Sequence, residues 1–458
     1  MDFALSYRMR RLSVLFMGLF LASHLAGAVV PPRAAGVAST PMLLQQARLQ
    51  PADVAVGDGF GAGVISADGL TALLPATQQD CAAGEDCGAV YVFALNQGVW
   101  AQQAKLTLEP PASHDLWGNV ALSANGDVAL IGTPARDCEA GLECGVAYVF
   151  ERSGGQWNSR TRLSSGGPRA GDYFGSAVAL SGAGDRAFVG ALGEDCPGNP
   201  LDCGAIHIFR HSGGHWESEA TLLPQGSPDN IFFGNFFEVS RDGKTVMAER
   251  FVLSDLFAGD IYIFQETGGV WSQEATLLPD SDLREFVPVA LAGDGQTALI
   301  AARTYPGFSP PVYYVYVHDG AGSWTRQGPQ LPTSGGGSGS GGLSFDGNTA
   351  IVGLESGGKA QLFARSGGAW SLLQELIPNE PGAAQAMTFV ALSDNARTAL
   401  VGLPGVDCTG FSCRGAAFVF AAAALVPTVP TLGELGLALL ALLIAGTGAV
   451  LLRRRQAV

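Results

Sequence analysis

The sequence predicts an all-β fold, a seven-bladed β-propeller closed by an N-terminal strand, and three observations support this prediction. A pattern of four short runs, rich in aromatic and β-branched residues, repeats along the chain. The two ends of the repeat region complement each other. Glycine is abundant, with 63 residues in 458, and only 15% of residues are charged, which suits short strands and tight turns better than helices.

One complete repeat spans residues 171–223. Clusters of Gly, Asp and Ser separate its four runs, which is the layout of a four-stranded antiparallel sheet. The third run recurs seven times, at residues 89–93, 146–150, 204–209, 260–264, 313–317, 360–363 and 416–420. The repeats therefore indicate one large domain, although the length alone would permit two or three.

The first and last runs of the repeat region are incomplete. Residues 42–49 match residues 100–107, the fourth run of the first full repeat, but stand alone. The last repeat has its first three runs and lacks a fourth. Because an open ring would expose two sheet edges, we expect the N-terminal strand to pair with the last blade. The propeller should span residues 42–425.

The N-terminus has the pattern of a secretory signal. Arg8, Arg10 and Arg11 precede an apolar run at residues 14–25, and small residues end at Ala28. We expect residues 1–28 to be a cleaved signal peptide, since a membrane anchor would need a longer span. Residues 29–41 form a linker. The net charge of −15 repels phosphate backbones, so we expect no nucleic-acid partner.

A tryptophan opens the fourth run of six repeats. We expect each ring to pack between neighbouring blades, whereas a row of sugar-stacking rings is the alternative. The six residues are Trp100, Trp157, Trp216, Trp271, Trp324 and Trp370.

The eight cysteines occur as four local pairs, each between the second and third runs of a repeat. In an exported chain this arrangement predicts a disulfide within each loop. Zinc is the alternative, but the spacing and the lack of companion histidines argue against it. The pairs are Cys81 with Cys87, Cys138 with Cys144, Cys196 with Cys203, and Cys408 with Cys413.

Acidic residues accompany these loops. Strand direction places the cysteine loops on the same face as the links between blades, which carry Asp58, Asp115, Asp172 and Asp229. We interpret the loops as a candidate binding rim for a cationic partner or Ca²⁺; the alternative is a solvated rim that keeps the protein soluble. The rim residues are Asp80, Asp86, Asp137, Glu143, Asp195, Asp202 and Asp407.

The C-terminus has three parts. Residues 426–434 contain Val429, Pro430, Thr431 and Leu432, residues 435–452 are apolar or small, and residues 453–458 begin with Arg453, Arg454 and Arg455. The apolar run is just long enough for one transmembrane helix in the inner membrane, with the arginines in the cytoplasm. The propeller would then lie outside the cytoplasm.

This layout resembles the IPTL variant of the PEP-type sorting tails of Gram-negative bacteria, with Val429 where the family usually has Ile. The resemblance implies recognition by an exosortase-type membrane protease and transfer to the cell surface or extracellular matrix. An ordinary single-pass anchor is the alternative.

The repeats are similar to the FG-GAP repeats of integrin α-subunit propellers and their bacterial relatives. The similarity lies in Asp-x-Phe-Gly at residues 58–61 and 172–175, followed by Val-Ala-Leu-Ser and Val-Gly-Ala. It implies a propeller that binds or adheres. The calcium loop of such repeats would fall at residues 66–69, 123–126 and 181–184, where too few oxygen ligands remain, so we expect no cofactor.

Other motifs do not support catalysis. His207, His211 and His215 are interpreted as strand and turn positions, and residues 333–342 as a flexible link between blades. No catalytic signature occurs. The leading hypothesis is a displayed adhesion or ligand-binding module with an unknown protein or glycan ligand. The alternatives are a hydrolase or lyase acting on extracellular polysaccharide, and a purely structural matrix protein.

Overall fold

The computed structural model describes residues 42–422 except 109, 113–118, 196–201, 225–231, 253–254, 280–282, 305–309, 381, 383–386 and 411. The expected signal peptide, linker, sorting motif, membrane helix and basic tail lie outside these residues. Among the residues that are described, no helix is long and apolar enough to cross a bilayer.

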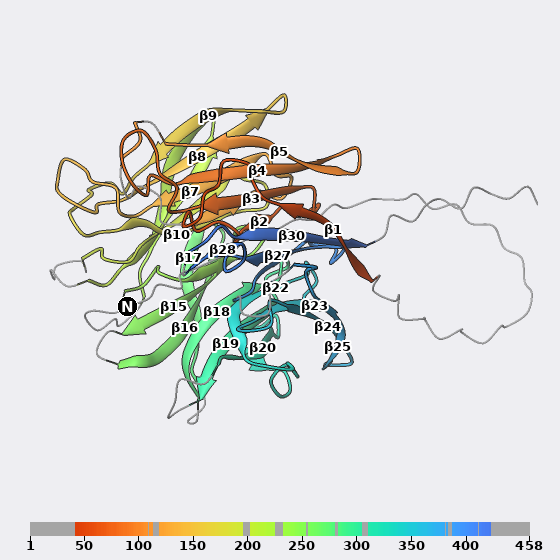
Figure 1. Cartoon of the computed structure of the whole chain (residues 1–458). Coiled ribbons are helices and arrows are strands. Elements are labelled where there is room, and N and C mark those ends of the chain that lie inside the picture. Colours follow the sequence, from red (N-terminus) through yellow and green to blue (C-terminus); the bar gives the residue numbers. More distant parts are fainter. Residues whose placement is uncertain are drawn as a thin grey trace, which may run out of the picture. The chain divides into compact units, whose positions relative to one another are not determined.

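The described strands form seven four-stranded antiparallel sheets, as the repeats predict (Figure 1). Blade 1 contains β2 (Val64–Ile65), β3 (Thr71–Ala76), β4 (Ala89–Asn96) and β5 (Val99–Leu106). Blade 2 contains β6 (Val120–Leu122), β7 (Val128–Thr133), β8 (Val146–Ser153) and β9 (Gln156–Leu163). Blade 3 contains β10 (Phe174–Leu180), β11 (Arg186–Ala191), β12 (Ala205–Ser212) and β13 (His215–Leu222).

The next three blades have the same strand order. Blade 4 contains β14 (Phe237–Val239), β15 (Thr245–Val252), β16 (Asp255–Thr267) and β17 (Val270–Leu277). Blade 5 contains β18 (Leu283–Leu291), β19 (Thr297–Thr304), β20 (Val312–His318) and β21 (Trp324–Arg326). Blade 6 contains β22 (Gly337–Leu343), β23 (Thr349–Leu354), β24 (Ala360–Ser366) and β25 (Ala369–Leu376).

Blade 7 is built from both ends of the repeat region. Its strands are β26 (Phe389–Leu392), β27 (Thr398–Leu403), β30 (Ala416–Ala422) and β1 (Leu43–Leu49), and a small hairpin of β28 (Cys408–Thr409) and β29 (Ser412–Cys413) lies beside them. β1 pairs antiparallel with β30, with Leu43 opposite Ala422 and Leu49 opposite Ala417. This confirms the predicted closure. Both leucines are buried, so the closing strand contributes apolar area as well as hydrogen bonds.

One sequence interpretation is wrong. The glycine-rich stretch 333–342 was expected to be a flexible link, but residues 337–343 form β22, the first strand of blade 6. Side chains are excluded here by close packing: a Cβ atom on Gly337 would lie 2.3 Å from the Tyr313 ring, and one on Gly341 would lie 2.8 Å from Val289. The glycines therefore serve the contact between blades 5 and 6.

The cores lie largely between blades rather than within them. The second strands are buried on both faces, as in β3, β11 and β23, because each blade is covered by two neighbours. The tryptophans pack against these cores as predicted: Trp271 of blade 4 meets Phe188 of blade 3 edge to face, with ring centroids 6.1 Å apart. Trp157 of blade 2 also donates to Gln103 Oε1 of blade 1 at 3.2 Å.

A ring of backbone hydrogen bonds links the turns that join the first and second strands of each blade. One bond crosses each of the seven boundaries, and the last returns from blade 7 to blade 1, where the Asp394 amide donates to the Ala67 carbonyl at 3.2 Å. The other six donors and acceptors are Ala67 to Ala124, Ala124 to Gly182, Gly182 to Arg241, Arg241 to Gly293, Asp294 to Phe345, and Phe345 to Asp394. The blades therefore follow chain order around a closed ring.

The same turns correspond to the loops where a calcium site was considered. In blade 1 the Asp68 carboxylate accepts the Ser66 hydroxyl at 2.5 Å and the Leu70 amide at 2.9 Å, while Ser66 Oγ accepts the Thr71 amide at 2.9 Å. These oxygens shape the turn itself.

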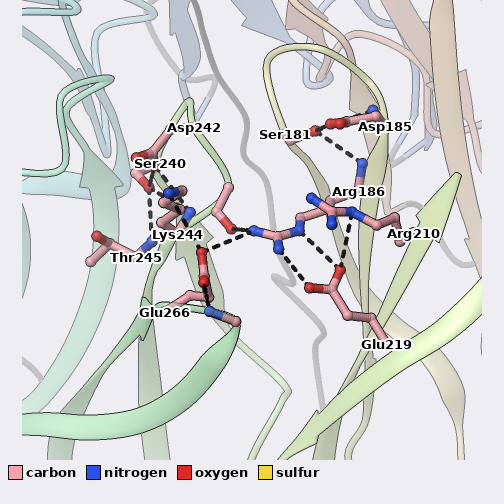
Figure 2. Close-up of polar contacts among 12 residues, drawn as sticks. Ser181, Asp185, Arg186, Arg210, Glu219, Ser240, Asp242, Lys244, Thr245 and Glu266 are labelled. Carbon is pink, nitrogen blue, oxygen red and sulfur yellow. Dashed lines mark hydrogen bonds and ion pairs between the residues drawn. The ribbon is translucent and has the colours of Figure 1, made fainter. Parts of the chain in front are cut away.

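A buried ionic network joins blades 3 and 4 (Figure 2). Arg186 donates to both carboxylate oxygens of Glu219 in its own blade, at 2.9 and 2.5 Å. It also reaches the Gly243 carbonyl at 3.1 Å and Glu266 at 3.6 Å, both in blade 4. At the boundary of blades 1 and 2 the arginine belongs to the later blade instead: Arg152 of blade 2 donates to Gln103 Oε1 of blade 1 at 3.0 Å. Each boundary thus has its own polar partners.

Candidate functional site

The loops between the second and third strands of blades 2, 3 and 7 dock onto the following blade. In blade 2 the Cys144 carbonyl accepts the Phe174 amide of blade 3 at 3.0 Å, and in blade 3 the Cys203 carbonyl accepts the Phe233 amide of blade 4 at 2.9 Å. The Cys413 carbonyl of blade 7 accepts the Gly57 amide ahead of blade 1 at 3.0 Å. The cysteine loops and the links between blades therefore share one face, as strand direction predicts.

Glycine permits this docking. At the boundary of blades 2 and 3, the Gly175 carbonyl approaches the Gly132 backbone so closely that a Cβ atom on Gly132 would lie 2.2 Å from it. Gly175 itself has φ of +96°. The Phe-Gly of one repeat and the Val-Gly or Ile-Gly of the preceding repeat thus form a single interblade contact.

Three of the four predicted disulfides are present in the described residues. Cys81–Cys87 and Cys138–Cys144 each have Cα atoms 5.8 Å apart, and Cys408–Cys413 has Cα atoms 3.8 Å apart. The fourth predicted pair includes Cys196, which lies outside the described residues. Because the ring closes, the four cysteine loops belong to consecutive blades, namely 7, 1, 2 and 3.

The acid before the first cysteine shapes its own loop. Asp80 Oδ1 accepts the Asp86 amide at 3.1 Å, and Asp137 Oδ1 accepts the Glu143 amide at 3.0 Å. Asp86 and Glu143 have φ of 53° and 56°, so this bond supports an unfavourable backbone conformation just before the second cysteine. These carboxylates therefore have a structural task besides any role at the rim.

Two predicted rim residues have basic partners. Arg48 Nη2 lies 2.6 Å from Asp407 Oδ2, and Gln50 Nε2 lies 3.1 Å from the same oxygen. The hydrogen bond from Gln50 and the Arg48 charge lower the pKa of Asp407. Arg169 Nη1 lies 2.6 Å from Asp195 Oδ2. Asp407 thus contacts Arg48 of the closing strand, which also pairs with Glu380 at 2.9 Å.

A group of interacting carboxylates lies at the boundary of blades 2 and 3. Asp172 is buried, and burial raises its pKa, with the charges of Glu194 and Asp195 adding to the effect. Burial raises the pKa of Asp202 as well, again with a contribution from Asp195. This end of the predicted rim therefore brings together acids from the link before blade 3 and from the cysteine loop of that blade.

Tyr173 borders the same group. Its hydroxyl donates to Glu143 Oε2 at 2.6 Å, and this bond raises the pKa of Tyr173 to about 12. His207 lies in strand β12, as predicted. Its Nε2 atom is 2.5 Å from Glu194 Oε2, and its Nδ1 atom is 3.3 Å from Thr221 Oγ1. No three His, Cys, Asp or Glu side chains gather as metal ligands in the described part of the chain.

The remaining predicted positions behave differently. Asp58 is buried and accepts the Ala55 amide at 2.8 Å and the Gln79 amide group at 3.2 Å. Asp115 and Asp229 lie outside the described residues. Two charged residues near the axis, Arg241 and Asp394, were not identified from the sequence. Each stands at the second position of the repeated turn, where blades 1, 2 and 3 have Ala67, Ala124 and Gly182, and the repeat pattern does not show that the two side chains meet.

Comparison with known proteins supports the repeat type and the fold. The family model described as FG-GAP repeat matches residues 157–209. Hydrazine synthase of Kuenenia stuttgartiensis is similar in structure, with a TM-score of 0.50 and 12% identity over 78% of this chain and 95% of that chain.

Periplasmic gluconolactonase of Pseudomonas aeruginosa has a TM-score of 0.48 and 16% identity, over 69% of this chain and 85% of that chain. No curated protein matches the chain. At these identities the similarity to solved structures concerns the fold alone.

Proposed function

We propose that this protein is an exported ligand-binding propeller whose disulfide-stiffened rim, on blades 7, 1, 2 and 3, binds a cationic partner. The observation that carries the proposal is that closure of the ring places the cysteine loops on four consecutive blades, in one arc, and that the loops of blades 7, 2 and 3 are each docked on the next blade. A rigid loop loses little conformational entropy on binding.

The charge of the arc favours a cationic partner. Residues 77–88 of blade 1 contain Asp80, Glu85 and Asp86 and no basic residue. The matching loop of blade 6 is short and contains one acid, Glu355, with Lys359 at its end. Because the acids concentrate on one side of the ring, the field there attracts positive groups and accelerates association.

Display outside the cell is part of the proposal. It is supported by the signal-like N-terminus, by the local disulfides and by the tail with Val429 to Leu432, the apolar run 435–452 and three arginines. An exosortase-type protease would process this tail and release the propeller to the cell surface or matrix.

A second function has specific support. Burial raises the pKa of Asp172 and of Asp202, and both lie in one acidic group with Glu194 and Asp195; glycosidases act through such pairs of carboxyl groups. Release of reducing sugar from extracellular polysaccharide by the wild-type protein, lost in Asp172→Asn, would support this function over binding alone.

The binding proposal is tested by neutralising the rim. We expect Asp80→Asn, Asp137→Asn and Asp195→Asn together to weaken binding of a lysine decapeptide roughly tenfold at low salt, while the asparagine oxygens preserve the loop hydrogen bonds. The matched control removes three charges elsewhere: Glu217→Gln on an outer strand, Asp319→Asn in blade 5 and Glu355→Gln on blade 6, all exposed. Equal affinities for the two combinations would contradict the proposal.

A further inference from the structure

A pocket of about 1150 Å³ lies at the outer edge of blade 2 on the face of the cysteine loops. Four segments form its walls: the link that precedes blade 2, the loop containing Cys138, the strands β8 and β9, and the link to blade 3. Its lining includes Pro110, Arg136, Tyr148, Arg160, Arg162 and Ser164.

Three guanidinium groups line this pocket. Arg136 is held in place by donating from Nη2 to the Pro110 carbonyl at 2.9 Å. Arg160 lies over the ring of Tyr148, 5.5 Å from its centroid, and Arg162 is opposite Tyr148 in the pairing of β8 with β9. Two of the three groups are thus oriented by neighbouring atoms, which reduces the entropy lost on binding a ligand.

The pocket differs in charge from the rest of the molecule. The chain has 26 basic residues against 41 acidic ones, yet three arginines line this one pocket. Asp137 and Glu139 also line it and oppose an anion. Asp137, however, is bound to the Glu143 amide of its own loop. In the described part of the chain Arg162 is exposed and has no ion-pair partner.

We propose that this pocket binds an acidic saccharide through the sugar carboxylate. The planar guanidinium group matches a carboxylate with two parallel hydrogen bonds, and the pocket is large enough for a short oligosaccharide rather than a single small anion. This proposal extends the proposed binding function by assigning a second ligand class, and it does not depend on the cationic partner of the rim.

The test is calorimetric titration of the full chain with trigalacturonate, with maltotriose as the neutral sugar and inorganic phosphate as the small anion. We expect trigalacturonate alone to bind well, Arg162→Gln to weaken it at least fivefold, and Arg160→Gln combined with Arg162→Gln to abolish it. Arg326→Gln is the matched control, because Arg326 lies 5.2 Å from the Tyr314 ring centroid in the same strand arrangement of blade 5. An unchanged circular dichroism spectrum establishes that each variant folds.

Three results would overturn the proposal: no binding of trigalacturonate, equal binding by wild type and Arg162→Gln, or phosphate binding as tight as trigalacturonate. The neutralised rim variant separates this proposal from the first. Because it removes the Asp137 charge from the pocket, it should bind trigalacturonate at least as tightly as wild type while losing affinity for the lysine decapeptide. Loss of both ligands in that variant would count against an independent saccharide pocket.

Discussion

Arg241 of blade 4 and Asp394 of blade 7 meet with Nη2 3.3 Å from Oδ1. Both lie in turns of the hydrogen-bonded ring, and blades 4 and 7 stand three places apart in a ring of seven. The ion pair therefore spans the axis of the propeller on the face opposite the cysteine loops. The Arg241 side chain is only 3% exposed, so this pair ties nearly opposite blades together in a shielded environment.

Arg241→Met should lower the free energy of unfolding by about 3 kcal/mol, because it leaves the Asp394 carboxylate without its partner across the axis. Urea unfolding followed by tryptophan fluorescence measures the change. The exposed Arg397, which neighbours the same turn, supplies the control: Arg397→Met should change the value by less than about 0.5 kcal/mol. Similar losses in both variants would contradict a special role for the axial pair.

The closing strand offers a second test. Leu49→Ala should destabilise the protein by about 2–4 kcal/mol, because Leu49 is 2% exposed and packs in a core shared by blades 7 and 1. Leu44→Ala, in the same strand but 50% exposed, should be nearly neutral. Thermal unfolding of the two variants provides the comparison. Equal decreases in Tm would show that β1 adds no buried core.

The disulfide loop of blade 2 should protect its boundary with blade 3. Replacing Cys138 and Cys144 with serine should lower the free energy of unfolding by about 2 kcal/mol, since the closed loop is short. Hydrogen exchange of the Phe174 amide, which is bound to the Cys144 carbonyl, should become faster. The Gly57 amide, bound to the Cys413 carbonyl in the intact loop of blade 7, is the internal control and should keep its protection.

The hydrogen bond from Tyr173 to Glu143 predicts a loss of stability at alkaline pH. The pKa of Tyr173 is raised to about 12, so the stability from this hydrogen bond is present below the unfolded pKa of about 10 and is lost as pH rises toward 12. Glu143→Gln should move the titration of Tyr173 back toward 10, measured by the absorbance of tyrosinate. Tyr173→Phe should lack the step altogether, and a titration unaffected by Glu143→Gln would refute the assigned cause.

The network of Figure 2 predicts coupling between blades. A double-mutant cycle with Arg186→Met and Glu266→Gln should give a coupling energy of about 1–2 kcal/mol, because both side chains are at least nine-tenths buried. The pair Arg210 and Glu219, 3.8 Å apart with Arg210 51% exposed, should couple by less than about 0.5 kcal/mol. A larger value for the exposed pair would reverse this assignment.

Local pattern explains why much of the fold could be predicted. Alternating residues and turn glycines mark the strands, and residues 42–49 match a fourth run so closely that the closure with β30 follows from the need to cover sheet edges. The glycine-rich β22 was missed because the usual signal of a strand is its side chains, whereas here the lack of side chains permits the packing.

The sequence by itself determined the strands other than β22, the seven repeats, the cysteine pairing in three described loops and the face that these loops share. Only the tertiary structure decided that the loops form one arc, that Arg48 pairs with Asp407, that Arg241 crosses the axis to Asp394, and that three arginines line one pocket. The physical reason is that repeat patterns fix short-range hydrogen bonds and burial, whereas ion pairs between residues more than a hundred positions apart depend on how the blades close into a ring.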